Sequence, residues 1–176
     1  MKQDINLGDL VNQIVTQTKD LDTIFSIIQW FKIAKPNPSN QDLIKQIAFH
    51  CEEFSEMLIA IRCDDIADMV ERLKYDLLSI SNDADESKEF MDNVDEAELI
   101  DALCDQIVTA LGVGYMISFD MEGALAEVNR SNYTKFTTDE HGNLVPYITK
   151  NGKIGKNPDT YRRPNLEPFM PSDFDE

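Results

Sequence analysis

The chain has 176 residues, the size of one domain, and 42% of them are apolar, which is enough for a hydrophobic core. Acidic residues outnumber basic ones by 33 to 16, so the formal net charge is -17. This charge excludes nucleic-acid binding through the general surface, because phosphates would be repelled. It fits instead a solvated surface, a cation site or an acidic decoy that imitates DNA.

The sequence further indicates a cytoplasmic protein that does not enter a membrane. The first residues, MKQDINLGDL, lack the apolar segment of a signal peptide. The longest apolar run, residues 108–119, is too short to span a bilayer and contains two glycines. The three cysteines are odd in number and lie within helical patterns, so we expect reduced, buried thiols.

Apolar residues recur at helical spacing along most of the first 136 residues. A polar, acidic stretch over residues 82–93 predicts a loop, either without regular structure or with one short turn of helix. The predicted helices are, in chain order, residues 6–20 continued by 21–35, a long helix capped at Ser39 or Asn40 that includes residues 49–61, then 64–81, 94–119 and 120–136. We therefore expect an all-α fold, a bundle of about five helices.

The composition changes after residue 136. Five of the seven prolines lie there, and Asn151–Gly152 between two extended segments predicts a short β-hairpin with a tight turn. We expect two parts, residues 1–136 as the helical domain and 137–176 as a hairpin followed by a Pro-rich arm. Seven of the sixteen basic residues fall between residues 128 and 163, so this segment is either a solvated tail or a segment that contacts phosphate.

The stretch FHCEEFSEMLIAI, residues 49–61, combines apolar helical spacing with three glutamates. On a helical wheel of about 100° per residue, Glu53 lies within the apolar arc formed by residues such as Phe49 and Met57. Glu56 lies at the edge of that arc, and Glu52 points further toward solvent. The wheel therefore predicts that Glu53 faces inward.

A second acidic stripe lies on the helix predicted over residues 94–119. Glu98, Asp101 and Asp105 fall within about 60° of one another on the wheel, and nearly every other direction is apolar. We expect this helix to be buried on most sides, with the carboxylates inside. Because both acidic helices are apolar on more faces than one layer can cover, the sequence also predicts a homodimer or homotetramer.

Buried carboxylates are costly unless they pair or bind a cation. The basic residues close to them in sequence are Arg62, Arg72 and Lys74. Oxygen ligands that converge from two helices suit Mg²⁺, or Mn²⁺ as a second choice. The other interpretation is that both stripes are solvent-facing carboxylates of a charged bundle.

Five segments in order resemble the all-α nucleoside triphosphate pyrophosphohydrolases, the MazG-like and phosphoribosyl-ATP pyrophosphohydrolase-like proteins, in the branch common in phages and bacteria. CEEFSE followed by ELID resembles the paired acidic signature of that family. QWFKIAKPNP, DALCDQIVTALGVGYMISFD, EVNRSNYTKF and NGKIGKNPDTYRRPNLEPF resemble further segments, and Lys32 stands where the family has a histidine. The resemblance covers residues 27–169.

The resemblance implies Mg²⁺-dependent cleavage of a free (d)NTP to the monophosphate and pyrophosphate, and it points to the same oligomeric state. It implies metal ligation by Glu53, Glu56, Glu98 and Asp101, with Asp101 and Asp105 as an alternative second pair. It implies catalytic or outer-sphere roles for Glu53, Glu52 and Asp105, since a carboxylate near a metal-bound water can take its proton. The implied substrate-binding residues are Trp30, Arg130, Asn132, Lys135, Lys153 and Lys156.

Two other functions stay open from the sequence. One is hydrolysis of phosphoribosyl-ATP, a reaction of histidine biosynthesis. The other is a non-enzymatic acidic interaction protein, such as a DNA mimic. The last predicts outward carboxylates and no dependence on metal, whereas the hydrolase predicts that Glu53 and the stripe beginning at Glu98 face inward.

Overall fold

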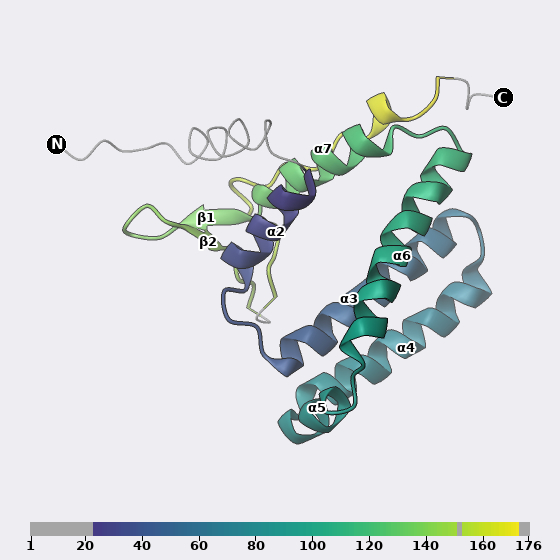
Figure 1. Cartoon of the computed structure of the whole chain (residues 1–176). Helices are drawn as coiled ribbons and strands as arrows, with labels where there is room; N and C mark the ends of the chain where they lie inside the picture. The colour runs from purple at the N-terminus through teal and green to yellow at the C-terminus, as the bar shows by residue number, and fades with distance from the viewer. Residues whose placement is uncertain (1–22, 151–152, 173–176) are drawn as a thin grey trace. The chain divides into compact units, whose positions relative to one another are not determined.

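A computed structural model describes residues 23–150 and 153–172 of the chain. Within these residues the fold is mostly helical, with one small antiparallel sheet near the C-terminus, which confirms the predicted class (Figure 1). The elements are α2 (Thr23–Ala34), α3 (Asn40–Ala60), α4 (Asp64–Asn82), α5 (Ala84–Met91), α6 (Glu96–Met116), α7 (Met121–Tyr133), β1 (Phe136–Thr138), β2 (Leu144–Pro146) and the 3-10 helix η1 (Glu167–Phe169). The helix predicted over residues 6–20 lies outside the described residues.

The chain forms two compact units. The second unit is continuous, Asn37–Leu103, and the first takes the described residues on both sides of it, up to Pro36 and from Cys104. The boundary between the units therefore falls within α6. The boundary predicted at residue 136 falls inside the first unit, where β2 contacts α2 and η1 contacts α7.

The second unit is built on the antiparallel pair α3 and α4 (Figure 1). Helix α3 begins with the predicted cap: Ser39 Oγ accepts from the Asp42 N–H, and the Asp42 carboxylate accepts from the Ser39 N–H. The buried face of α3 consists of Ile44, Ala48, Ser55 and Leu58. Helix α4 buries Ala67, Lys74, Leu77 and Ser81. Several of these side chains are small, which lets the two helices approach closely.

Helix α5 corrects the prediction of a loop over residues 82–93. Asp83 caps its N-terminus, since its side chain accepts from the N–H groups of Asp85 and Glu86. Ser87 is fully buried and its hydroxyl donates to the carbonyls of Ile80 and Asp83. The polar composition suggested a loop, but a good N-cap and one buried serine are enough to hold two turns of helix against α3 and α4.

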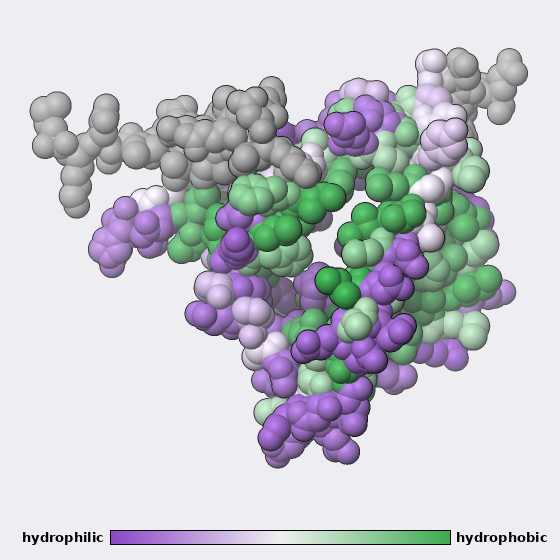
Figure 2. Space-filling model, viewed as in Figure 1, coloured by the Kyte–Doolittle hydropathy of each residue, from purple (hydrophilic) through white to green (hydrophobic). Residues whose placement is uncertain are grey.

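Helix α6 corrects the prediction of burial on most sides. Its side chains are largely exposed, for example Ile100 at 64% and Val108 at 64%, and Gly114 is its one buried residue. Cys104 is likewise an exposed free thiol, so the expectation of buried cysteines is wrong for it. Periodicity identifies the apolar face of a helix but not what covers it. The space-filling view shows extensive hydrophobic surface on the visible face (Figure 2).

By length and composition alone, α6 is the one helix in the described part of the chain that could cross a membrane. The 18-residue stretch of α6 that meets this criterion is 6% buried. A single helix of this kind is weak evidence for a membrane span, because the core helix of a soluble protein and a signal sequence pass the same test. The predicted cytoplasmic location stays a prediction.

The first unit has a small core in which α2 packs against α7. Tyr133 and Phe136 are buried there with Ala34, and Trp30 stacks on Phe136 with 5.4 Å between ring centroids. Ser26 is buried and bonds to α7 twice: Asn129 Nδ2 donates to its hydroxyl at 2.7 Å, and the Tyr133 hydroxyl donates to its carbonyl at 2.9 Å. These contacts join segments about a hundred residues apart in the sequence.

Two hairpin-like pairings follow α7. Strands β1 and β2 pair in antiparallel register, Thr137 opposite Val145, across a turn in which the Asp139 carboxylate accepts from the backbone of His141 and Asn143. This hairpin confirms the β-hairpin predicted near the C-terminus, but it precedes the turn predicted at Asn151–Gly152. At the predicted hairpin, Ile148 pairs with Ile154 in an antiparallel bridge, while the turn residues 151–152 lie outside the described residues.

Candidate functional site

The acidic motif of α3 is divided between two faces of the helix. Glu53 and Glu56 are exposed, whereas Glu52 is half-buried and its Oε1 lies 3.5 Å from Lys74 Nζ of α4. The predicted inward position of Glu53 is therefore wrong in this chain. Helix α3 has apolar residues on two sides. The side that is buried carries the small residues Ala48 and Ser55, which contribute little to the apolar arc of a helical wheel.

Lys74 of α4 is the partner of Glu52. Its side chain is buried, and its Nζ lies 3.5 Å from Glu52 Oε1 and forms a hydrogen-bonded ion pair with Glu71. Burial lowers the pKa of Lys74, but the hydrogen bond to Glu71 and the charges of Glu52 and Glu71 outweigh it and raise the pKa above its ordinary value. Lys74 is one of the three basic residues that lie close in the sequence to the acidic motifs. Glu52 thus helps join two helices.

The carboxylates of α6 lie on a solvent-exposed helix. Glu98, Asp101 and Asp105 are all exposed. The helix start is fixed by Asp95, whose Oδ1 accepts from the N–H groups of Ala97 and Glu98 at 3.0 and 3.2 Å. Asp101 follows Glu98 by three positions, so both carboxylates lie on one side of α6 and can bind one ligand.

The described residues do not gather three or more carboxylate, imidazole or thiolate groups close enough to hold a metal ion. What they offer is two pairs, Glu53 with Glu56 and Glu98 with Asp101, all four within the second unit. Mg²⁺ is commonly bound by one or two carboxylates together with substrate phosphates and water, not by a cage made of protein alone. Each pair alone offers the one or two carboxylates that such an ion takes from a protein.

Trp30, a candidate for flanking the base, is part of the core of the first unit. It stacks on Phe136 and meets Phe31 edge-on, with 5.0 Å between centroids. Its Nε1 donates to the Asn132 carbonyl at 3.0 Å. Its ring is thus engaged by neighbouring side chains, which is the usual role of an aromatic residue at helical spacing.

The segment EVNRSNY, which the resemblance connects with phosphate, makes mostly structural contacts. Arg130 forms a two-point ion pair with Glu127, at 2.6 Å from Nε and 2.7 Å from Nη2. Helix α7 ends at Tyr133, so Lys135 lies beyond it and does not share a helix face with Asn132 as expected. At the C-cap, the Thr134 hydroxyl donates to the Ser131 carbonyl at 2.6 Å.

The remaining predicted cations lie after the sheet. Lys153 and Lys156 are exposed. The Lys153 carbonyl accepts from the N–H of Thr149, which continues the second hairpin. Lys156 Nζ lies 5.3 Å from the centre of the Tyr161 ring, a cation–π contact.

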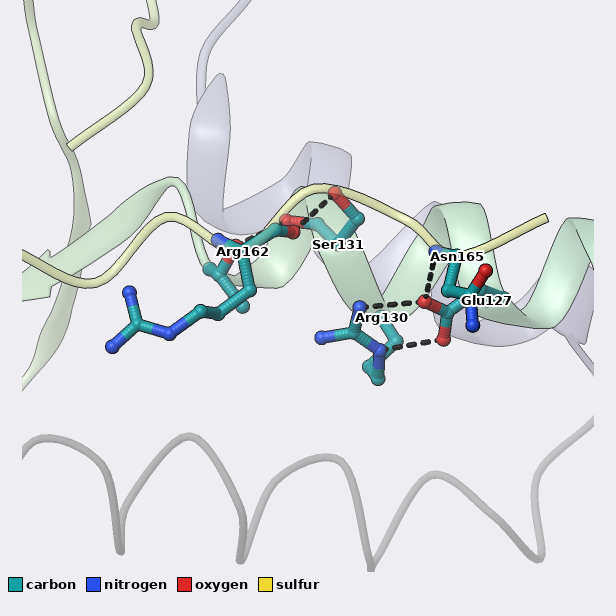
Figure 3. Close-up of polar contacts among 6 residues, drawn as sticks. Glu127, Arg130, Ser131, Arg162 and Asn165 are labelled. Atoms are coloured by element: carbon teal, nitrogen blue, oxygen red, sulfur yellow. Dashed lines mark hydrogen bonds and ion pairs between the residues drawn. The ribbon is translucent and has the colours of Figure 1, made fainter. Parts of the chain in front are cut away.

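A C-terminal arm, residues 157–169, lies along α7, to which it is joined by hydrogen bonds. Ser131 Oγ donates to the Arg162 carbonyl at 2.8 Å, and the Arg162 N–H donates to Thr134 Oγ1 at 2.9 Å (Figure 3). The Asn165 N–H donates to Glu127 at 2.9 Å. At the end of the arm, the Phe169 carbonyl accepts from the N–H of Asp120, the N-cap of α7. The Pro-rich composition predicted the extended conformation but not its attachment.

Glu127 holds both α7 and the arm. Its carboxylate accepts from Arg130 and from the Asn165 N–H, and the side chain is 18% exposed. The hydrogen bonds from Arg130 lower the pKa of Glu127 below its ordinary value, against the opposing effect of burial. The same pair raises the pKa of Arg130. At neutral pH both groups are therefore charged and fixed.

No protein family, no curated protein and no solved structure matches this chain.

Proposed function

We propose that the protein is a Mg²⁺-dependent nucleoside triphosphate pyrophosphohydrolase, which cleaves a free (d)NTP to the monophosphate and pyrophosphate. The observation that carries this proposal is the presence of two carboxylate pairs at one-turn spacing, on two 21-residue helices. Their order and spacing resemble the acidic signature of the all-α pyrophosphohydrolases. Phosphoribosyl-ATP is the alternative substrate within the same chemistry.

The donor chemistry supports a metal-bound triphosphate as ligand. The carboxylates of Glu53, Glu56, Glu98 and Asp101 are exposed, so an incoming ion can reach them. Mg²⁺, when bound there with substrate, would neutralise phosphate charge and polarise the bond to be cleaved. Glu52 is less suited to a direct role, since Lys74 engages it. Asp105, one turn beyond Asp101, remains available for proton transfer or as an alternative ligand.

The exposure of the carboxylates also favours a second function. An acidic interaction protein presents its carboxylates outward, and Glu53, Glu98 and Asp101 are exposed in this chain. With a net charge of -17, such a protein would bind a basic surface, for example that of a DNA-binding protein. This function requires neither metal nor turnover, so a single assay separates it from hydrolysis.

The test is pyrophosphate release from a panel of nucleotides with Mg²⁺, for the parent and two charge-matched variants. We expect Glu53→Gln to reduce kcat/KM by about 100-fold or more, because a ligand worth several kcal/mol is lost and about 1.4 kcal/mol corresponds to a factor of ten. Glu89→Gln removes an exposed carboxylate of α5 outside both pairs and should leave the rate unchanged. Absence of turnover in the parent, with equal effects of both variants on binding to a basic protein, would favour the acidic interaction protein.

We also propose that the protein is a homodimer or homotetramer. The support is the exposed apolar surface of α6, where Ile107 is 53% and Leu111 is 42% exposed. A helix with such a surface is usually covered in solution. Sedimentation at micromolar concentration should give a mass above that of one chain, and a monomer at every concentration would contradict the proposal.

A further inference from the structure

Lys74 is a charged residue in the middle of the interface between α3 and α4. It lies on the same buried face of α4 as Ala67 and Ser81, which are seven positions before and after it. At one end of this interface, Ser55 Oγ donates to the Ala67 carbonyl at 3.1 Å. At the other end, Gln41 Nε2 donates to the Ser81 carbonyl at 3.0 Å. Lys74 therefore lies between two fixed points of a helix pair, at a position that an apolar residue usually occupies.

Two carboxylates and one aromatic ring lie around the ammonium of Lys74. Its Nζ lies 3.5 Å from Glu52 Oε1 of α3, is hydrogen-bonded to Glu71 one turn earlier on α4, and lies 4.7 Å from the centre of the Tyr75 ring. The Lys74 side chain is 8% exposed, whereas those of Glu52 and Glu71 are 38% and 35% exposed. One buried cation thus joins two carboxylates from different helices, and each carboxylate is still partly accessible to solvent.

The positive charge of Lys74 is what keeps these two carboxylates together. Burial opposes that charge, but the hydrogen bond to Glu71 and the charges of both glutamates raise the pKa of Lys74 above its ordinary value. Without the ammonium, two like charges would remain beside a buried interface, in a chain with 33 acidic and 16 basic residues. Carboxylates in such a place take up a proton or bind another cation.

We propose that Lys74 takes the place of a metal ion between Glu52 and Glu71, so that Glu52 is a structural residue of this chain and not a ligand or base for an external cation. Both carboxylates already have an oxygen within 3.5 Å of one nitrogen atom. A divalent cation holds oxygen ligands at about 2.0–2.6 Å, so it would need the same position that the ammonium fills. The ammonium therefore excludes such an ion by its charge and its volume.

This inference departs from the role that the family resemblance implies for Glu52, a catalytic or outer-sphere group. It concerns Glu52, Glu71 and Lys74 alone, and it holds whether or not the protein hydrolyses nucleotides. The test accordingly uses no nucleotide. Its probe is Mn²⁺, which takes the same oxygen ligands as Mg²⁺ and whose free concentration is measured by electron paramagnetic resonance.

The decisive variant is Lys74→Met, which removes the ammonium and keeps an unbranched side chain in the interface. We expect it to bind one more Mn²⁺ per chain than the parent, with a Kd below about 1 mM. At ten times that Kd, Mn²⁺ should raise its melting temperature by about 3–5 °C more than that of the parent. In a chelating buffer the variant should melt below the parent, because two partly buried carboxylates have lost their counter-charge.

Two controls isolate the position. Lys88→Met makes the same change at an exposed residue of α5 and should bind as many Mn²⁺ ions as the parent. The double variant Lys74→Met with Glu52→Gln also lacks the ammonium, but it has only one of the two carboxylates. It should not gain the additional ion.

Glu52→Gln alone tests the parent site and does not depend on the folding of Lys74→Met. We expect it to bind the same number of Mn²⁺ ions as the parent, with Kd changed less than about twofold, since no metal ligand is lost. Its melting temperature should fall by about 2–5 °C, because Lys74 loses one of its two counter-charges. Glu53→Gln is the comparison, since there the proposed function expects weaker metal binding.

The proposal would be overturned by Lys74→Met binding no more Mn²⁺ than the parent, or by Glu52→Gln losing a bound ion. Lys74→Met that stays unfolded at saturating Mn²⁺ would also overturn it, because an equivalent cation should replace the ammonium. Lys74→Met that folds only with Mn²⁺, as followed by circular dichroism, would support it. A parent without turnover would refute the hydrolase, whereas an ion gained by Lys74→Met would still support the role of Lys74.

Discussion

Helices α3 and α6 have the same length, 21 residues, and each carries a pair of carboxylates one turn apart, but their environments differ. Helix α3 buries one face against α4, with Ile44 and Ala48 fully inaccessible to solvent. Helix α6 is exposed on nearly all sides. Both helices were predicted to be buried from their apolar residues, but only α3 packs closely against a neighbour, which shows that the sequence pattern predicts the existence of a helix much better than the identity of its neighbours.

The largest expected effect tests this contrast directly. Ile44→Ala should lower the free energy of unfolding by about 2–5 kcal/mol, because it leaves a cavity between α3 and α4. Ile100→Ala, at a position that is 64% exposed in the single chain, should change the free energy of unfolding of the monomer by less than about 0.5 kcal/mol, and by more at concentrations where the proposed oligomer covers α6. Urea unfolding of both variants measures the difference. A large cost for Ile100→Ala would mean that another surface covers α6 in solution, and a concentration-dependent midpoint would identify a second copy.

The next effect concerns the arm, which is joined by polar bonds instead of apolar packing. Glu127→Gln should lower the free energy of unfolding by about 1.5–3 kcal/mol at neutral pH, since it removes a charged acceptor for Arg130 and Asn165. The pKa of Glu127 is lower in the folded protein than its ordinary value of 4.5. Its contribution is therefore present above about that pH and is lost as the pH falls through the folded pKa.

The difference in unfolding free energy between the parent and Glu127→Gln isolates the contribution of Glu127 from that of the other carboxylates, which both proteins share. Unfolding measured at pH 7, 5 and 3 should show the difference between parent and variant shrinking toward zero at the lowest pH. A difference that is constant over this range would show that the Glu127–Arg130 pair does not stabilise the protein through its charge.

The smallest expected effect is at Gly112 of α6. A methyl group added there meets no atom within 4 Å, so Gly112→Ala should stabilise the helix by about 0.5–1 kcal/mol. Gly123→Ala is the opposite case, because the added carbon would lie 2.5 Å from the Phe169 ring and from Asp120 Oδ2. Thermal melts of the two variants should move in opposite directions. A destabilising Gly112→Ala would indicate that a partner approaches α6 at this point.

What could be predicted from the sequence is mainly local. Ser39 caps α3 because a serine followed three residues later by Asp42 satisfies the first backbone N–H groups within the same turn. The start of α7 at Asp120 follows the same rule. Helix α5 was missed because its cap, Asp83, stands in a polar stretch that offers no apolar periodicity.

The site could be predicted less well, for a physical reason. The rotation of α3 depends on Ala48 and Ser55, small side chains that allow close approach but add little to a hydrophobic pattern. The arm depends on hydrogen bonds between an extended segment and a helix some thirty residues earlier, such as Ser131 with Arg162. Hydrogen bonds between a helix and an extended segment produce no periodic pattern in the sequence, so they could not be predicted from it.

The division of the chain also sets an order of events during synthesis. The second unit, Asn37–Leu103, is continuous, so the residues that it brings into contact are synthesised without interruption. Helix α2 is made before it, yet the groups that satisfy Ser26 and Trp30 belong to α7, 102 to 107 residues later. At about 5–20 residues per second, α2 waits roughly 5–20 s with its apolar side chains unprotected. We expect nascent-chain chaperones to meet this protein at α2.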